Sequence, residues 1–138
     1  MNCQKDIQVG CLKPLKGNLM SKNQNVKKAM ETAGKLFGDK IPETGASPVF
    51  AQASFAHVYG EIWSREGLDL KTRSLITVAA LVAMDKPKEL AIHLKGALNV
   101  GWTKEELTEV ILHLSYYAGF PTGIEGAKVL EEVCAGSD

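Results

Sequence analysis

The chain has 138 residues, of which 45% are hydrophobic and 7% aromatic, and its 16 Lys and Arg residues are balanced by 16 Asp and Glu residues. This length is typical of one domain and is sufficient to bury a core without a metal or a disulfide. The zero formal net charge excludes the strong positive field on which nucleic-acid and anionic-membrane binders depend. The longest uncharged apolar run, Ser74 to Met84, is about half of the roughly 20 residues that a membrane span requires, and the N-terminus has no apolar signal region. We therefore expect a cytoplasmic protein that binds neither nucleic acid nor membrane.

Residues 1–24 are polar and show no sustained hydrophobic period. They predict an arm that is either disordered or packed on a neighbouring subunit, ahead of a helical domain over residues 25–138. The three cysteines are Cys3, Cys11 and Cys134, an odd number with no C-x-x-C pair and no histidine at metal-ligand spacing. This pattern supports neither a disulfide framework nor a zinc site, and we assign these thiols no role.

Apolar spacing and capping signals predict six helices and no strand, and hence an all-α single-domain bundle. The first helix begins at Asn25 and is stopped by Gly38, and the second begins at the cap Ser47 with Pro48 in its first turn and ends near Trp63. The remaining boundaries are a cap at Asp69, a cap at Asp85 with Pro87, a stop at Gly101, a capping box of Thr103 and Glu106, a stop at Gly119, and a last helix from Pro121 to Cys134.

The third predicted helix is apolar on every side between Leu75 and Met84, where Thr77 is the single polar residue. Such a helix must be covered all round, which six short helices achieve most easily when a second subunit covers one face. This segment therefore predicts a homo-oligomer.

Two arginines, Arg65 and Arg73, flank the break between the second and third helices, whereas the other basic residues are lysines. A guanidinium group binds a carboxylate through two parallel hydrogen bonds, so the pair is a candidate carboxylate-binding corner. Ion pairs with the neighbouring acids Glu61, Glu66 and Asp69 are the alternative.

Three histidines are candidates for chemistry. His57 and Glu61 stand at i and i+4 on one helix face, a spacing that suits a general base, two metal ligands or a simple surface pair. His93 lies in the apolar stripe of the fourth helix, so its ring is directed inward, as in a catalytic or an ordinary core histidine. His113 is expected to be solvated or to lie at the edge of a groove. Tyr116 and Tyr117 either present a hydroxyl group to a pocket or serve as packing residues with a polar end.

The chain has no phosphate-binding Gly-rich loop, no G-x-S-x-G elbow and no H-E-x-x-H motif. We therefore do not expect nucleotide hydrolysis, serine hydrolase chemistry or zinc proteolysis.

Several short motifs occur between about residues 55 and 134. They are G-E-I-W-S-R-E-G-L from Gly60, T-R-S-L-I-T from Thr72, E-L with H-L at Glu89 to Leu94, N-x-G at Asn99, E-x-x-E-V from Glu106, and Y-x-G-x-P from Tyr117. With these motifs, this part of the chain resembles the γ-carboxymuconolactone decarboxylase family. The first two segments resemble the decarboxylase branch specifically. The related peroxidase branch carries a C-x-x-C pair where this chain has Lys86 and Glu89, so a thiol-dependent peroxidase is disfavoured because the nucleophile is missing.

The resemblance implies an all-helical fold that assembles as trimers or hexamers, with sites near subunit contacts. It also implies decarboxylation, without a metal or cofactor, of 4-carboxymuconolactone to 3-oxoadipate enol-lactone in the catabolism of aromatic compounds. In this reaction the lactone itself accepts the electrons that carbon dioxide leaves behind, so the protein must bind a dianion, stabilise an oxyanion and supply a proton.

The implied catalytic residues are His93 and Glu61, and the implied substrate-binding residues are Arg65, Arg73, Trp63 and Tyr117. One departure is the segment Gly38 to Pro42, where the family carries G-D-A-H-V and this chain has no histidine. A related carboxylated substrate and a non-catalytic ligand-binding oligomer of the same fold are the alternatives.

Overall fold

The computed structural model describes residues 19–43 and 45–136, and every regular element in these ranges is helical. The all-α class predicted from the sequence is confirmed for this part of the chain. The elements are α1 (Leu19–Phe37), α2 (Pro48–His57), the π-helical turn η2 (Val58–Ile62), α3 (Leu70–Ala83), α4 (Pro87–Asn99), α5 (Lys104–Ala118) and α6 (Phe120–Ala135).

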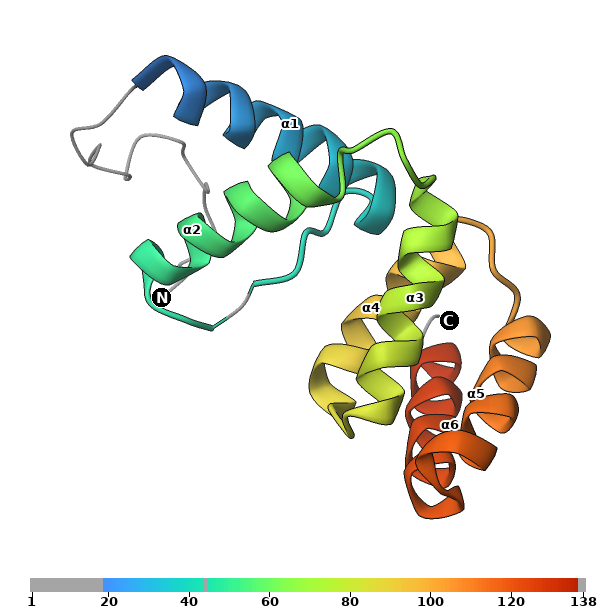
Figure 1. Ribbon diagram of the computed structural model, residues 1–138. Coiled ribbons are helices and arrows are strands. Elements are labelled where there is room, and N and C mark those ends of the chain that lie inside the picture. Colours follow the sequence, from blue (N-terminus) through green and yellow to red (C-terminus); the bar gives the residue numbers. More distant parts are fainter. Residues whose placement is uncertain (1–18, 44, 137–138) are drawn as a thin grey trace.

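The helices form two groups, as Figure 1 shows. In one group, α1 lies beside the continuous segment of α2 and η2. The other group is the bundle of α3 to α6. The short segment 63–69 connects the groups, and α1 also packs against α4.

The main core lies within the bundle, where each helix contributes apolar side chains at helical spacing. It consists of Val78, Leu81 and Val82 from α3, Leu90, Leu94 and Ala97 from α4, Leu107 and Ile111 from α5, and Val129, Leu130 and Val133 from α6. In the other group, α1 buries Ala29, Ala33 and Leu36, whereas α2 buries no residue. The pair of helices is therefore packed less deeply than the bundle.

Most of the predicted helix ends are confirmed. Asp69 accepts a hydrogen bond from the Thr72 backbone N–H, and Thr103 and Glu106 form a reciprocal capping box. Gly101 adopts a φ of 95°, and the Trp102 N–H donates to the Ala97 carbonyl, which closes α4 in a Schellman motif.

The cap predicted at Asp85 is wrong. Lys86 occupies the N-cap position of α4 and makes no side-chain cap, while Asp85 has a φ of 52° and ends α3. The Lys86 N–H donates to the Leu81 carbonyl and the Asp85 N–H to that of Val82. This Schellman motif satisfies the last carbonyls of α3, and it fixes Asp85 as a helix end because aspartate tolerates the left-handed region.

Two further boundaries differ from the prediction. Helix α1 begins at Leu19, six residues before Asn25, because residues 19–24 contain no glycine or proline and extend an existing helix at little cost. Ser47 precedes α2 but makes no side-chain cap, although Pro48 opens the helix as predicted. Residues 1–18, with Cys3 and Cys11, lie outside the described residues.

None of the described helices is long and apolar enough to cross a membrane.

Candidate active site

A row of aromatic side chains runs along the inward side of α2 and η2. Phe55, Tyr59 and Trp63 follow at intervals of four residues, and their ring centroids lie 5.5 and 5.6 Å apart. The Trp63 ring stacks on the His93 imidazole of α4, with centroids 5.9 Å apart and an angle of 30° between the rings. Phe37 from the end of α1 meets Tyr59 and His93 edge-on, at 5.8 and 5.7 Å. His93 therefore lies where α1, η2 and α4 meet, against aromatic rings.

This environment keeps the imidazole of His93 uncharged. Burial lowers its pKa below the ordinary value of 6.5, so the neutral form dominates at pH 7. Its Nδ1 is buried and has no hydrogen-bond partner among the described residues. A proton on Nδ1 would find no acceptor there, which favours the tautomer that carries the proton on Nε2. A neutral imidazole of this kind is suited to donating a hydrogen bond to a developing oxyanion.

The neighbouring phenol of Tyr59 is also uncharged, because burial raises its pKa to about 12. At neutral pH the Tyr59 side chain therefore presents an apolar ring and one uncharged hydroxyl group. Phe37, Phe55 and Tyr59 were not predicted as site residues, although the regular spacing of Phe55, Tyr59 and Trp63 is visible in the sequence.

A row of polar side chains lies on the other side of the same segment. His57 Nδ1 is 3.0 Å from Glu61 Oε2, which confirms the predicted contact between them. The second carboxylate oxygen, Oε1, accepts a hydrogen bond of 2.6 Å from Asn25 Nδ2 on α1. The Glu61 carboxylate is thus held by His57 and Asn25 and not by His93. Asn25 was not selected from the sequence, because its contact crosses between two helices.

Gly60 permits this contact between the helices. A Cβ atom at Gly60 would lie only 2.3 Å from the Asn25 carbonyl oxygen, so any larger residue would push α1 away from η2. The Ser64 hydroxyl donates to the Gly60 carbonyl at 2.6 Å and completes the end of the π-helical turn. Single π-helical turns of this kind are frequent at functional sites.

The two arginines differ in their availability. The Arg73 guanidinium donates to the carbonyls of Leu68 and Arg65, at 3.1 and 3.0 Å, and so fixes the segment between η2 and α3. The Arg65 side chain is exposed, and no ion pair or hydrogen bond within the described residues engages its guanidinium. Arg65 is therefore the better placed of the two to bind a carboxylate.

Within its own chain, Tyr117 lies apart from His93 and the aromatic rings around it. It is exposed at the end of α5, and its ring contacts that of His113 at 5.0 Å. Because α5 packs mainly on α6 and α3, a contact of Tyr117 with the His93 group requires a neighbouring subunit.

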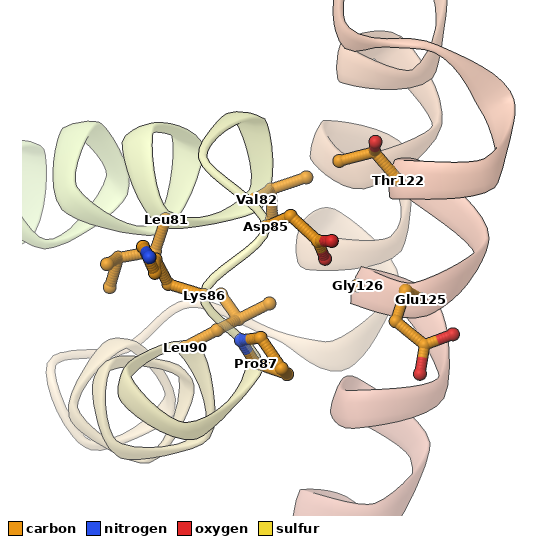
Figure 2. Close-up of a pocket in the computed structure, with 9 residues that line it drawn as sticks. All are labelled: Leu81, Val82, Asp85, Lys86, Pro87, Leu90, Thr122, Glu125 and Gly126. Carbon is orange, nitrogen blue, oxygen red and sulfur yellow. The ribbon is translucent and has the colours of Figure 1, made fainter.

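Two hollows among the described residues lie away from His93. The one in Figure 2 lies between the α3–α4 turn and α6, beside Asp85, Pro87 and Gly126, and is too small to hold a water molecule. The other, of about 500 Å³, opens over the first turns of α5 and is lined by three glutamates, which disfavour an anionic ligand.

No group of three or more His, Cys, Asp or Glu side chains in the described ranges is placed to hold a metal ion. His57 and Glu61 therefore lack a third ligand there, and their contact is better interpreted as a carboxylate that orients an imidazole. Cys134 is a free, half-buried thiol on α6.

The neutral histidine and the free arginine are each suited to interact with a small anionic molecule. Residues 48–132 match the model of the carboxymuconolactone decarboxylase family, and the chain belongs to this family. The chain is 37% identical over 120 residues to a 4-carboxymuconolactone decarboxylase of Acinetobacter baylyi, across 83% of this chain and 90% of that protein. It is 39% identical over 74 residues to a nitrosuccinic acid decarboxylase of Metarhizium robertsii, across 54% of this chain and 52% of that protein. The protein is a carboxy-lyase of the carboxymuconolactone decarboxylase type.

Proposed function

We propose that the substrate is 4-carboxymuconolactone and the product 3-oxoadipate enol-lactone. The observation that carries this proposal is the similarity to the Acinetobacter baylyi decarboxylase over nearly its whole length. The reaction breaks the bond to the carboxylate beside the ring oxygen, and the electron pair moves through the double bond to the lactone carbonyl. The carbon next to that carbonyl then takes a proton.

The names of the two relatives support a substrate class. Carboxymuconolactone and nitrosuccinic acid each carry two carboxylates and a group that accepts electrons, a conjugated lactone in one and a nitro group in the other. A protein for this class must bind the carboxylate that remains and stabilise charge on the accepting oxygen.

The described residues suit these tasks. Arg65 offers a free guanidinium to the remaining carboxylate. Neutral His93 offers a hydrogen bond from Nε2 to the oxygen that gains charge, while Trp63 supplies an apolar face beside it. Arg73 holds the segment that carries Arg65, so its role is positioning.

The test is turnover by purified protein on a panel of 4-carboxymuconolactone, nitrosuccinate and muconolactone, which lacks the carboxylate that leaves. We expect carbon dioxide release from the first substrate and none from muconolactone. We expect His93→Gln to lower kcat by about 10²-fold, as for loss of an oxyanion donor, and Arg65→Gln mainly to raise KM. Lack of turnover of 4-carboxymuconolactone would refute the proposed substrate.

We also propose that the protein forms a homo-oligomer in which exposed apolar side chains meet. Val49 and Phe50 on α2 are 67% and 71% exposed, and Ile76 on α3 and Met84 directly after it are also more than half exposed. Further exposed apolar side chains lie on α5 and the first turns of α6: Leu112, Tyr116, Tyr117, Phe120 and Ile124. Large apolar side chains that are exposed together are typical of surfaces covered by another subunit.

Light scattering after size exclusion tests this assembly. The expected mass is a multiple of the 14.9 kDa chain, and Tyr116→Asp combined with Phe120→Asp should reduce it. A monomer at micromolar concentration would contradict the proposal.

A further inference from the structure

Helix α1 is joined to its neighbours by a side-chain amide near each of its ends. Near the start of the helix, Asn25 Nδ2 donates to Glu61 Oε1 of η2 at 2.6 Å. At the end of the helix, Asn99 Nδ2 of α4 donates to the carbonyls of Lys35 and Leu36, at 3.1 and 3.0 Å, and satisfies two carbonyls that the helix itself leaves free. The two amides therefore connect α1 both to η2 and to α4.

Two glycines allow α1 to lie close to these same elements. A Cβ atom at Gly60 of η2 would clash with the Asn25 carbonyl oxygen, and one at Gly96 of α4 would lie 3.0 Å from the Phe37 ring. The apolar side chains that α1 buries are mostly small, because two of them are alanines: Ala29, Ala33 and Leu36. Since small side chains bury little apolar area, the polar contacts provide a large share of the attachment of α1.

The elements that meet at the Asn25–Glu61 bond also carry the rings around His93. Phe37 at the end of α1 lies edge-on to the imidazole, with centroids 5.7 Å apart. Trp63, directly after η2, stacks on the imidazole with centroids 5.9 Å apart. A single hydrogen bond between side chains thus joins the helix that carries one ring to the turn that carries the other.

The Glu61 carboxylate has no contact with His93 itself. Trp63 follows Glu61 by two residues, about half a helical turn, so the two side chains leave the segment on opposite sides. The carboxylate is 42% exposed, and its two oxygens are bound to Asn25 and His57. Any effect of Glu61 on His93 must therefore pass through the positions of α1 and η2.

We propose that Glu61 is a positioning residue and not a catalytic one, because with Asn25 it holds α1 on η2 and so keeps Phe37 and Trp63 packed on the imidazole of His93. This inference rests on the proposed function for the role of His93. The two rings exclude water from the imidazole and fix its orientation, which keeps it neutral and directs its Nε2 proton. Loss of the Asn25–Glu61 bond should loosen this packing.

NMR of the histidine rings measures the packing without any substrate. The chain has three histidines, so His57→Gln and His113→Gln identify the His93 signals by elimination. In wild type, the stacked Trp63 ring should shift the His93 ring protons, and the His93 pKa should lie below 6.5. In Asn25→Ala this ring-current shift should shrink, and the pKa should move towards 6.5 because water reaches the imidazole.

Turnover separates a positioning role from a chemical one. Glu61→Gln retains an oxygen that accepts from Asn25 but loses the carboxylate, so kcat should stay within about threefold of wild type. Glu61→Ala and Asn25→Ala remove the bond and should each lower kcat by about tenfold. The double variant should be no slower than either single variant, since both substitutions remove the same bond.

Glu131→Ala is the matched control. Glu131 on α6 binds Lys104 on α5 at 2.7 Å, so it also joins two helices through an exposed carboxylate. Its loss should change neither the His93 signals nor kcat. Alanine forms helix more readily than asparagine, so Asn25→Ala should not unwind α1, and circular dichroism and the mass in solution check this.

Two results would overturn the inference. One is a kcat for Glu61→Gln that falls by about 10²-fold with unchanged His93 signals, since the carboxylate would then take part in the chemistry. The other is a ring-current shift and a His93 pKa in Asn25→Ala equal to those of wild type. A wild type that turns over none of the substrates would refute the proposed function, whereas the NMR comparison would still decide whether Asn25 and Glu61 hold the rings on His93.

Discussion

The imidazole of His93 couples protonation to folding. Its pKa is lowered by burial from 6.5 in the folded chain, whereas in the unfolded chain it is close to the ordinary value. Well above pH 6.5 both states are neutral at this position, so the group does not change the free energy of unfolding there. As the pH falls below 6.5, the unfolded state binds more protons than the folded state, so the free energy of unfolding decreases.

Urea unfolding of wild type and His93→Gln at pH 7.5, 6.5 and 5.5 measures this effect. We expect the wild-type free energy of unfolding to fall across this range and the variant to show a smaller slope. Asp69 does not interfere, because hydrogen bonds from Thr72 lower the pKa of this carboxyl below 3.8. Its contribution is lost only at more acidic pH. Equal slopes in the two proteins would contradict the assignment to His93.

The candidate site was predictable where one helix carries both partners. The spacing of His57 and Glu61 predicted their contact, and the apolar stripe predicted that His93 points inward. The contacts of Asn25 with Glu61 and of Trp63 with His93 were not predictable, because they depend on how α1 and η2 approach each other and α4. Local sequence carries little information on such approach distances.

At the scale of helices, polar caps and glycines marked most ends. The capping box at Thr103 and the glycine stop at Gly101 could be recognised because their hydrogen bonds are local. The end of α3 at Asp85 was not recognised, since an aspartate before a proline more often begins a helix than ends one. The π-helical turn was also missed, and the predicted helix was continued through it to Trp63.

Two glycines offer a matched test of the contact between Gly60 and α1. Gly60→Ala should destabilise the protein by about 2–3 kcal/mol, because its Cβ would meet the Asn25 carbonyl oxygen at 2.3 Å. Gly34→Ala in α1 should stabilise it by about 0.5–1 kcal/mol, since a Cβ there meets nothing within 4 Å. Thermal and urea unfolding measure both changes. A Gly60→Ala variant as stable as Gly34→Ala would show that α1 does not require this close approach.

At the scale of the whole molecule, the two helix groups differ in how well their own chain covers them. The bundle of α3 to α6 contains the main core, whereas α2 buries no residue and exposes Val49 and Phe50. An uncovered helix opens at low free energy, and its amide protons exchange quickly with solvent.

Amide hydrogen exchange at two protein concentrations tests whether a subunit covers α2. At low concentration, where the oligomer dissociates, we expect fast exchange in α2 and slow exchange in α4. At high concentration, protection in α2 should rise while that in α4 changes little. Exchange in α2 that is fast and independent of concentration would show that this helix is not part of a subunit contact.

The π-helical turn also affects where this protein can change in length. It lies between Val58 and Ile62, where the aromatic row and the polar row occupy opposite sides of one short segment. A π-helical turn accommodates one extra residue within a helix, so deletion of one codon there would convert the turn to ordinary α-helix and leave the residues after it in nearly the same orientation. Deletion of one residue from α2 would instead rotate the preceding and following side chains by about 100° relative to each other, so changes in length should be accepted more readily in the π-helical turn than in α2.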